Sequence, residues 1–288
     1  MLRGFSCRSI GTRFHSDDAT ELFRMPDALA PAVQLRDVRL DRGGRTIVSG
    51  IDLTVPRGSI TAVLGPSGSG KSTLLSALTG ELQPAAGTVE VFGQRVPVRN
   101  RELLELRKSI GVLLQGNGLL TDLTAGENIA LPLRLHTKLP KPVIARLVAM
   151  KLQAVGLRAA GDLYPRELSG GMARRVALAR ALALDPPLMI YDEPLTGLDP
   201  IASGVIMSLI GRLNASLGLT SIIVTHHVHE TLPVADHAIV IANGRIVFQG
   251  TPAQLEASTD PLVGQFLRGE PDGPIAFDRG DLARTEAA

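Results

Sequence analysis

The chain has 288 residues, 44% of them hydrophobic and 20% charged, which is enough for one or two globular domains with a sizeable core. The net charge of +2 is too balanced to favour a nucleic-acid partner, and a single cysteine, Cys7, excludes an internal disulfide, as expected in a reducing cytoplasm. No uninterrupted apolar run approaches the roughly 18 to 20 residues of a membrane span, so any membrane role requires a partner.

Residues 1–31 differ in composition from the rest of the chain. Arginine and serine residues give them a weak likeness to a transit peptide, but Asp17, Asp18 and Glu21 break that pattern. We expect this segment to be a disordered or non-native extension, with Met25 as an alternative start, and we exclude it from the fold.

The first folded segment is predicted to be a small antiparallel β-layer. Residues 33–40 and 51–55 alternate apolar and polar side chains on either side of a turn at Gly43 and Gly44, as strands with one buried face do. Residues 88–92, followed by Gly93, indicate a further hairpin.

A glycine-rich loop follows residues 60–64, an apolar run predicted to be a buried strand, and precedes a predicted helix. Glycines let successive backbone N–H groups point into one concavity, where the positive end of the helix favours phosphate. Lys71 is expected to reach the β- and γ-phosphates of a nucleotide, and the Ser72 hydroxyl to bind Mg²⁺. The predicted nucleotide-binding residues are Gly65, Pro66, Ser67, Gly68, Ser69, Gly70, Lys71, Ser72 and Thr73.

Residues 101–185 change in character and predict an inserted helical subdomain. Apolar residues at three- and four-residue spacing over 143–155 predict a helix that ends at Gly156. Further on, Ser169, Gly170 and Gly171 precede a strong helix-forming stretch. Because Ser169 is a suitable N-cap and the glycines expose backbone N–H groups, this stretch is interpreted as a second phosphate-binding helix end.

The chain then alternates strand and helix. Residues 188–191 and 221–225 are apolar runs typical of parallel strands, with a helix predicted between them over 201–213. This order implies a parallel sheet with right-handed crossovers, and Asn243-Gly244 predicts a hairpin between residues 238–242 and 245–249. The tail, residues 269–288, loses periodicity and is expected to be extended or disordered.

Two acidic residues, Asp192 and Glu193, follow the strand predicted at 188–191. Open α/β sheets bind ligands at the carboxyl ends of their strands, and an acidic pair there is costly without a cation. Asp192 is therefore predicted to bind Mg²⁺, and Glu193 to act as the general base or to position the water that attacks the γ-phosphate.

These motifs resemble, in order and spacing, those of ABC-type ATPases over about residues 33–268. The matching positions are 65–72, Gln115, 168–172, 188–193, 197–199 and His226. The resemblance implies an α/β fold with a P-loop NTPase core and parallel sheet, an N-terminal β-layer and the helical subdomain, within a domain spanning 32–268. It also implies a head-to-tail dimer, in which Ser169, Gly170 and Gly171 of a second copy close over the ATP.

The same resemblance implies roles for three further residues. Gln115 would sense Mg²⁺ and the attacking water, Asp199 would communicate across the dimer interface, and His226 would contact the γ-phosphate. Because His227 and His229 are close in sequence, a zinc site is the alternative for His226. Adjacent residues point to opposite faces of a strand, so we expect poor zinc geometry there.

One departure from the family concerns the nucleotide base. The family often places an aromatic residue before the first turn to stack on adenine, whereas this chain has Arg42. We expect the guanidinium plane of Arg42 to stack on the base. ATP is the expected nucleotide, with GTP as the alternative.

A narrower resemblance, carried by residues 131–140, 167–175 and 199–204, is to the ATPase subunits of the Mla (maintenance of lipid asymmetry) phospholipid transporters, of the MCE-associated group. It implies three partners, namely a polytopic membrane permease contacted through about residues 116–134, an MCE-domain lipid-binding protein and a STAS-domain protein. It also implies a peripheral location at the cytoplasmic face of the inner membrane, reached through the permease.

The expected function is ATP hydrolysis that energises phospholipid movement through that permease and maintains outer-membrane lipid asymmetry. One alternative is an ABC ATPase for another cargo, such as an amino acid, a metal or a lipoprotein. The other is a non-transport ABC protein acting on DNA or the ribosome, which the single cassette and the small net charge disfavour.

Overall fold

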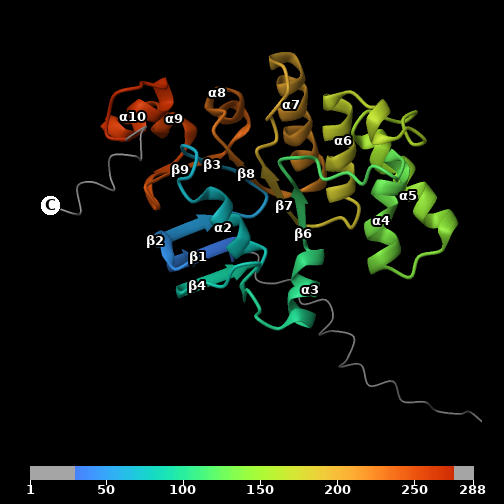
Figure 1. Ribbon diagram of the computed structural model, residues 1–288, viewed down its shortest axis with the longest axis horizontal. Coiled ribbons are helices and arrows are strands. Elements are labelled where there is room, and N and C mark those ends of the chain that lie inside the picture. Colours follow the sequence, from blue (N-terminus) through green and yellow to red (C-terminus); the bar gives the residue numbers. More distant parts are fainter. Residues whose placement is uncertain (1–29, 276–288) are drawn as a thin grey trace, which may run out of the picture.

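The computed structural model describes residues 30–275, which form two β-sheets with helices packed around them (Figure 1). Residues 1–29 and 276–288 lie outside the described part of the chain. The predicted N-terminal extension with Cys7, apart from its last two residues, and most of the predicted tail therefore also lie outside it.

The smaller sheet has the strand order β2-β1-β4-β5. Strands β1 (Val33–Arg42) and β2 (Arg45–Val55) pair antiparallel, β4 (Ala86–Val91) pairs with the other side of β1, and β5 (Gln94–Arg95) pairs with β4. Along β1, Val33 and Leu35 are buried while Arg36 is exposed, which is the alternation seen in the sequence. The predicted antiparallel β-layer is confirmed.

The larger sheet has the order β10-β9-β3-β8-β7-β6, and all of its pairs are parallel except that of β10 with β9. Its topology confirms the predicted parallel sheet and the hairpin at Asn243-Gly244. The strands are β3 (Ile60–Leu64), β6 (Ile110–Leu113), β7 (Leu188–Asp192), β8 (Thr220–Thr225), β9 (His237–Ala242) and β10 (Arg245–Gly250).

The central sheet is buried because separate apolar clusters cover its two faces. In β7, Met189 and Tyr191 belong to the cluster shared with the helices, whereas Leu188 and Ile190 belong to the cluster shared with the smaller sheet. A continuous apolar run is therefore needed in β7, since alternate residues serve different cores. Packing on both faces therefore fixes where β7 ends, and the polar residues of the site begin at that end.

The described helices connect these strands and cover the sheet. In Figure 1, α4, α5 and α6 gather at the end of the molecule away from β1, β2 and β4. The helices are α2 (Lys71–Leu78), α3 (Asn100–Lys108), α4 (Ala125–His136), α5 (Lys141–Ala154), α6 (Gly170–Ala181), α7 (Pro200–Leu217), α8 (Val228–Thr231), α9 (Pro252–Glu256) and α10 (Pro261–Arg268), with short 3₁₀ turns at Pro165–Glu167 and Leu232–Val234.

The helical subdomain is smaller than the predicted range 101–185. Strand β6 lies within that range but pairs with β7 in the central sheet, and α3 packs beside β6. The helices that pack on one another are α4, α5 and α6. The first part of the predicted range, which holds α3 and β6, therefore belongs to the α/β core.

Within the described chain, α7 is long and apolar enough to pass for a membrane span by length and composition. Its buried side includes Ile206, Ile210 and Leu213, which pack in the core shared with the central sheet. Its polar Asn214 donates to the carbonyl of Gly58 and accepts from Ser221, so this side of the helix is fastened to the sheet. We therefore interpret α7 as a core helix.

Candidate active site

The glycine-rich loop joins β3 to α2 and has a shape that only glycine allows at two positions. Gly65 has φ +150°, and a Cβ there would lie 2.1 Å from the carbonyl oxygen of Ile241. Gly70, just before α2, has φ +109°, and a Cβ there would lie 2.6 Å from a methyl group of Val48. A side chain at Gly65 would therefore push the loop away from β9, and one at Gly70 would push it away from β2.

Lys71 folds back over this loop. Its Nζ donates to the carbonyl oxygen of Gly65 at 2.6 Å and to that of Pro66 at 2.9 Å. Burial lowers the pKa of Lys71, while the negative charges of Glu193 and Asp192 act in the opposite sense. The residue is thus a partly desolvated donor placed between the loop and the two acidic side chains.

The loop fits the phosphate groups of a nucleotide. The hydroxyl of Ser69 is buried and has no hydrogen-bond partner among the described residues. The first turn of α2 has no side-chain cap and no acidic residue, so no side chain competes with an anion for its N–H groups. A phosphate oxygen would satisfy both needs, because it accepts from hydroxyl and backbone donors alike.

Asp192 ends β7, two strands away from β3 in the sheet. Burial raises its pKa, the adjacent charge of Glu193 raises it further, and Lys71 lowers it. A divalent cation would offset the cost of that half-buried negative charge, and carboxylate and hydroxyl oxygens suit Mg²⁺. The position therefore fits the metal role expected for Asp192.

Glu193 is held by four separate constraints. Its backbone has φ +48°, and its N–H donates to the carbonyl oxygen of Val224 at 2.8 Å. Its Oε2 accepts from the hydroxyl of Thr225 at 3.0 Å, and its Oε1 lies 3.0 Å from Nδ1 of His226. Both carboxylate oxygens are therefore oriented by residues at the end of β8, while the side chain keeps 12% of its surface exposed.

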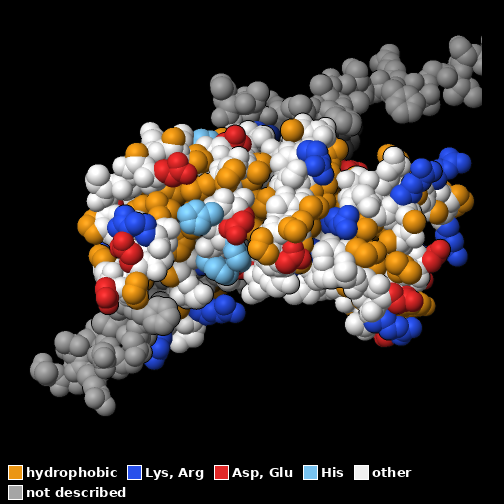
Figure 2. All heavy atoms as spheres, turned by 90° about the horizontal axis from the view of Figure 1, so that it is seen from above, with side chains coloured by type: hydrophobic (Ala, Val, Ile, Leu, Met, Phe, Trp, Pro, Cys, Tyr) orange, Lys and Arg blue, Asp and Glu red, His pale blue; other side chains and the backbone are white. Residues whose placement is uncertain are grey.

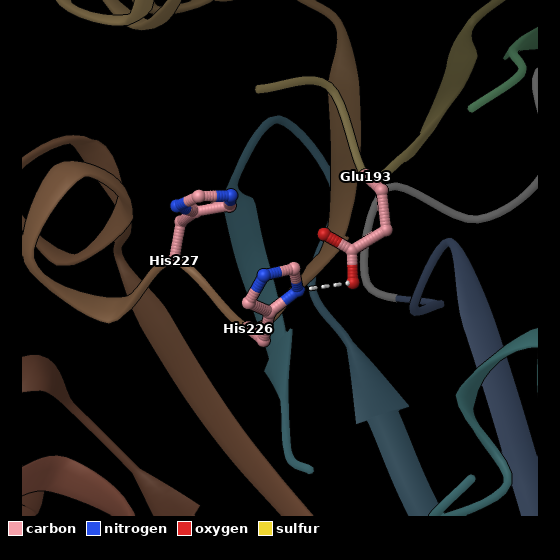
Figure 3. Close-up of side chains that lie close together, drawn as sticks. All are labelled: Glu193, His226 and His227. Carbon is pink, nitrogen blue, oxygen red and sulfur yellow. Dashed lines mark hydrogen bonds and ion pairs between the residues drawn. The ribbon is translucent and has the colours of Figure 1, made fainter. Parts of the chain in front are cut away.

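The expectation that adjacent histidines diverge is wrong for His226 and His227. Their ring centroids lie 4.3 Å apart, and Figure 3 shows both rings beside Glu193. Strand β8 ends at Thr225, and His227 has φ −82° and ψ 84°, so the alternation of a strand no longer applies to this pair. His229 lies on α8 and is outside this group.

Gln115 and Arg42 are placed less tightly. Gln115 follows β6, the strand next to β7, and its side chain makes no hydrogen bond to any residue in the described range. Arg42 is the last residue of β1 and is exposed at the β1–β2 hairpin. Val48, on β2 of the same hairpin, lies next to Gly70. Both side chains are thus free to turn towards a ligand, and neither is brought against the acidic pair.

The second predicted phosphate-binding helix end lies in a different place from the first. Ser169 caps α6, its hydroxyl accepting from the N–H of Met172 at 3.2 Å. A cavity of about 310 Å³ beside it is lined by residues of 169–175 and 197–206 and by no residue of the glycine-rich loop. Ser169, Gly170 and Gly171 therefore do not share a pocket with Lys71 in one copy of the chain.

Sequence reasoning missed Arg174, which connects three parts of the site. It is 3% exposed, and its guanidinium donates to the carbonyl oxygens of Leu114, Gln115 and Thr196, each at 3.0 Å. It thereby ties α6 to the segment after β6 and to the loop after Glu193. The only signal in the sequence is an arginine among the alanines of a helix, which is also a common surface pattern.

Comparisons with known proteins agree with this arrangement. The model of the ABC transporter family matches residues 48–196. The intermembrane phospholipid transport system ATP-binding protein MlaF of Haemophilus influenzae is 51% identical over 246 residues, which is 85% of this chain and 93% of that protein.

Two solved structures are also similar. The cbiO1 subunit from Clostridium perfringens, part of the ABC transporter complex cbiONQ, has a TM-score of 0.75 at 30% identity, covering 83% of this chain and 96% of that one. The ATP-binding cassette MJ0796, a dimer in a post-hydrolysis state bound to ADP and Pi, has a TM-score of 0.70 at 29% identity, covering 76% and 98%.

We expect Arg174→Met to lower the free energy of unfolding by about 2 to 4 kcal/mol, because three carbonyl oxygens lose the charged donor that a buried side chain supplies. Urea denaturation of the full chain measures this. Arg212→Met is the matched control, since Arg212 is exposed on α7 and, in the described part of the chain, its side chain donates only to Ser208. Its effect should stay within about 0.5 kcal/mol, and equal losses in the two variants would contradict the role of Arg174.

Proposed function

The chain belongs to the ABC transporter family, and from that premise we propose that it is the ATP-hydrolysing subunit that drives phospholipid movement through a separate membrane permease. The observation that carries the hydrolytic part is the Glu193 carboxylate, held at both oxygens beside a phosphate-binding loop. The phospholipid cargo rests on the likeness to MlaF of H. influenzae.

The residues of the loop, 65–73, would bind the phosphates, with Lys71 as their cationic partner. Mg²⁺ would be held by the hydroxyl of Ser72 and the side chains of Asp192 and Gln115. When bound, Mg²⁺ neutralises charge on the phosphates and orients them. Arg42 would stack on the base, since it is exposed at the hairpin that flanks the loop.

Glu193 would take a proton from the attacking water or hold that water in line. Thr225 and His226 restrict how its carboxylate can rotate, so the oxygen that faces water is set before the nucleotide binds. Such orientation lowers the cost of reaching the reactive geometry. His226, which is 49% exposed, would turn from Glu193 to the γ-phosphate when the nucleotide is present.

A second copy of the chain would complete each site. The cavity beside Ser169 has no phosphate-loop residue, and Ile201 and Val205 near it are exposed apolar side chains at the start of α7. An exposed apolar rim near the pair of glycines that begins α6 suits a surface that another copy covers. The dimeric state of MJ0796 supports this arrangement.

The remaining partners follow from the likeness to MlaF of H. influenzae, a component of an intermembrane transport system. The permease would contact the segment 116–134, where Leu120 is exposed, and would hold the chain at the cytoplasmic face of the inner membrane. An MCE-domain lipid-binding protein and a STAS-domain protein would complete the assembly.

We expect Glu193→Gln to retain ATP binding but to lower turnover by about 10²- to 10⁴-fold, because the amide keeps the shape and cannot accept the proton. Phosphate release and binding of a fluorescent nucleotide are measured on the same preparation. Glu230→Gln, at an exposed position on α8, is the control and should behave as wild type. Near wild-type turnover of Glu193→Gln would remove this residue from the proposed chemistry.

We expect Ser169→Glu to abolish hydrolysis while leaving nucleotide binding by the isolated subunit intact, because the new negative charge would repel the ATP held by the other copy. Thr251→Glu, which alters the N-cap of α9, controls for the lost cap and should hydrolyse ATP normally. Loss of binding by isolated Ser169→Glu would mean that Ser169 acts on its own copy's nucleotide.

A further inference from the structure

Three ligating side chains converge beside the phosphate loop. One atom each of Glu193, His226 and His227 lie within 4.8 Å of one another, and Figure 3 shows the three groups turned towards a common space. His227 has no part in the hydrolytic roles described above. Figure 2 shows histidine side chains gathered on one face of the molecule, where solvent reaches them.

The convergence is built into the end of β8. The hydroxyl of Thr225 donates to Oε2 of Glu193 at 3.0 Å and accepts from the backbone N–H of His227 at 3.1 Å. A single buried hydroxyl thus fixes the carboxylate and the turn that carries the second imidazole. Ordered ligands bind a cation at lower entropic cost than mobile surface histidines do.

This donor set suits a zinc-like cation. Two imidazoles and one carboxylate are a common zinc set, and ligand atoms of tetrahedral Zn²⁺, at about 2.0–2.1 Å from the metal, lie roughly 3.3 Å apart. Oε1 of Glu193 and Nδ1 of His226 are already 3.0 Å apart. A modest rotation of the His227 ring, with water as the fourth ligand, would complete the coordination.

We infer that Glu193, His226 and His227 form an inhibitory site for a zinc-like divalent cation in the nucleotide-free chain. The inference rests on the proposed function, because it deepens the regulation of the same site. A bound cation occupies the carboxylate oxygen needed for water activation and holds His226 away from the nucleotide. Mg²⁺ does not compete there, since it prefers octahedral oxygen ligands to imidazole.

The first test measures metal binding without nucleotide, in competition with a chromogenic zinc chelator. The wild-type chain should bind one more zinc ion than His227→Ala. His229→Ala is the matched control, because His229 is a nearby exposed histidine outside the group, and it should bind as wild type. Zinc bound elsewhere on the chain adds the same number of ions to all three proteins. The inference would be overturned if wild type and His227→Ala bound the same total number of zinc ions per chain.

The second test measures ATP hydrolysis at a Mg²⁺-ATP concentration well below its KM, where most of the chain is nucleotide-free, while zinc is raised. His227→Ala should keep the basal rate and require at least about tenfold more zinc for half inhibition, because it lacks one ligand. His229→Ala should be inhibited as wild type. Equal inhibition of wild type and His227→Ala would overturn the inference. If the wild-type chain had no ATPase activity, the proposed function would be refuted. The number of zinc ions bound in the first test would then still test the metal site.

Discussion

The register between β7 and β8 is the constraint on which the site depends. Because Asp192 pairs with Val224, the next residues, Glu193 and Thr225, come level at the carboxyl edge of the sheet. The hydroxyl of Thr225 then holds one oxygen of the carboxylate, and His226 holds the other. A slip of one residue would exchange the buried faces of β7 and separate these groups, so the core that fixes the register also fixes the chemistry.

The elements that rest on local pattern could be predicted from the sequence. The glycine loop between β3 and α2, the strand before Asp192 and the Asn243-Gly244 hairpin each have their signal within about ten residues. Arg174 could not be found in this way, because its three acceptors come from two distant loops. The expectation for His227 was wrong for a different reason, since the alternation of a strand was extended two residues beyond the end of β8.

The phosphate loop is proposed to be half of a site that a second copy of the chain completes. It offers donors and a buried hydroxyl that has no partner within residues 30–275, while the glycines after Ser169 open onto another surface with its own cavity. Arg174 links α6, which begins after Ser169, to the segment after β6 and to the loop after Glu193. Closing of one copy on another can therefore be transmitted to the segment proposed to contact the permease, without any contact between nucleotide and permease.

Complementation between two inactive subunits tests the shared site most directly. In a head-to-tail dimer, a Lys71→Ala subunit paired with a Ser169→Glu subunit places both changes in one site and leaves the other intact. Mixing the two variants in equal amounts should restore up to about a quarter of the wild-type hydrolysis, since half of the random dimers are mixed and each has one working site. No activity above that of the separate variants, at any mixing ratio, would contradict the account.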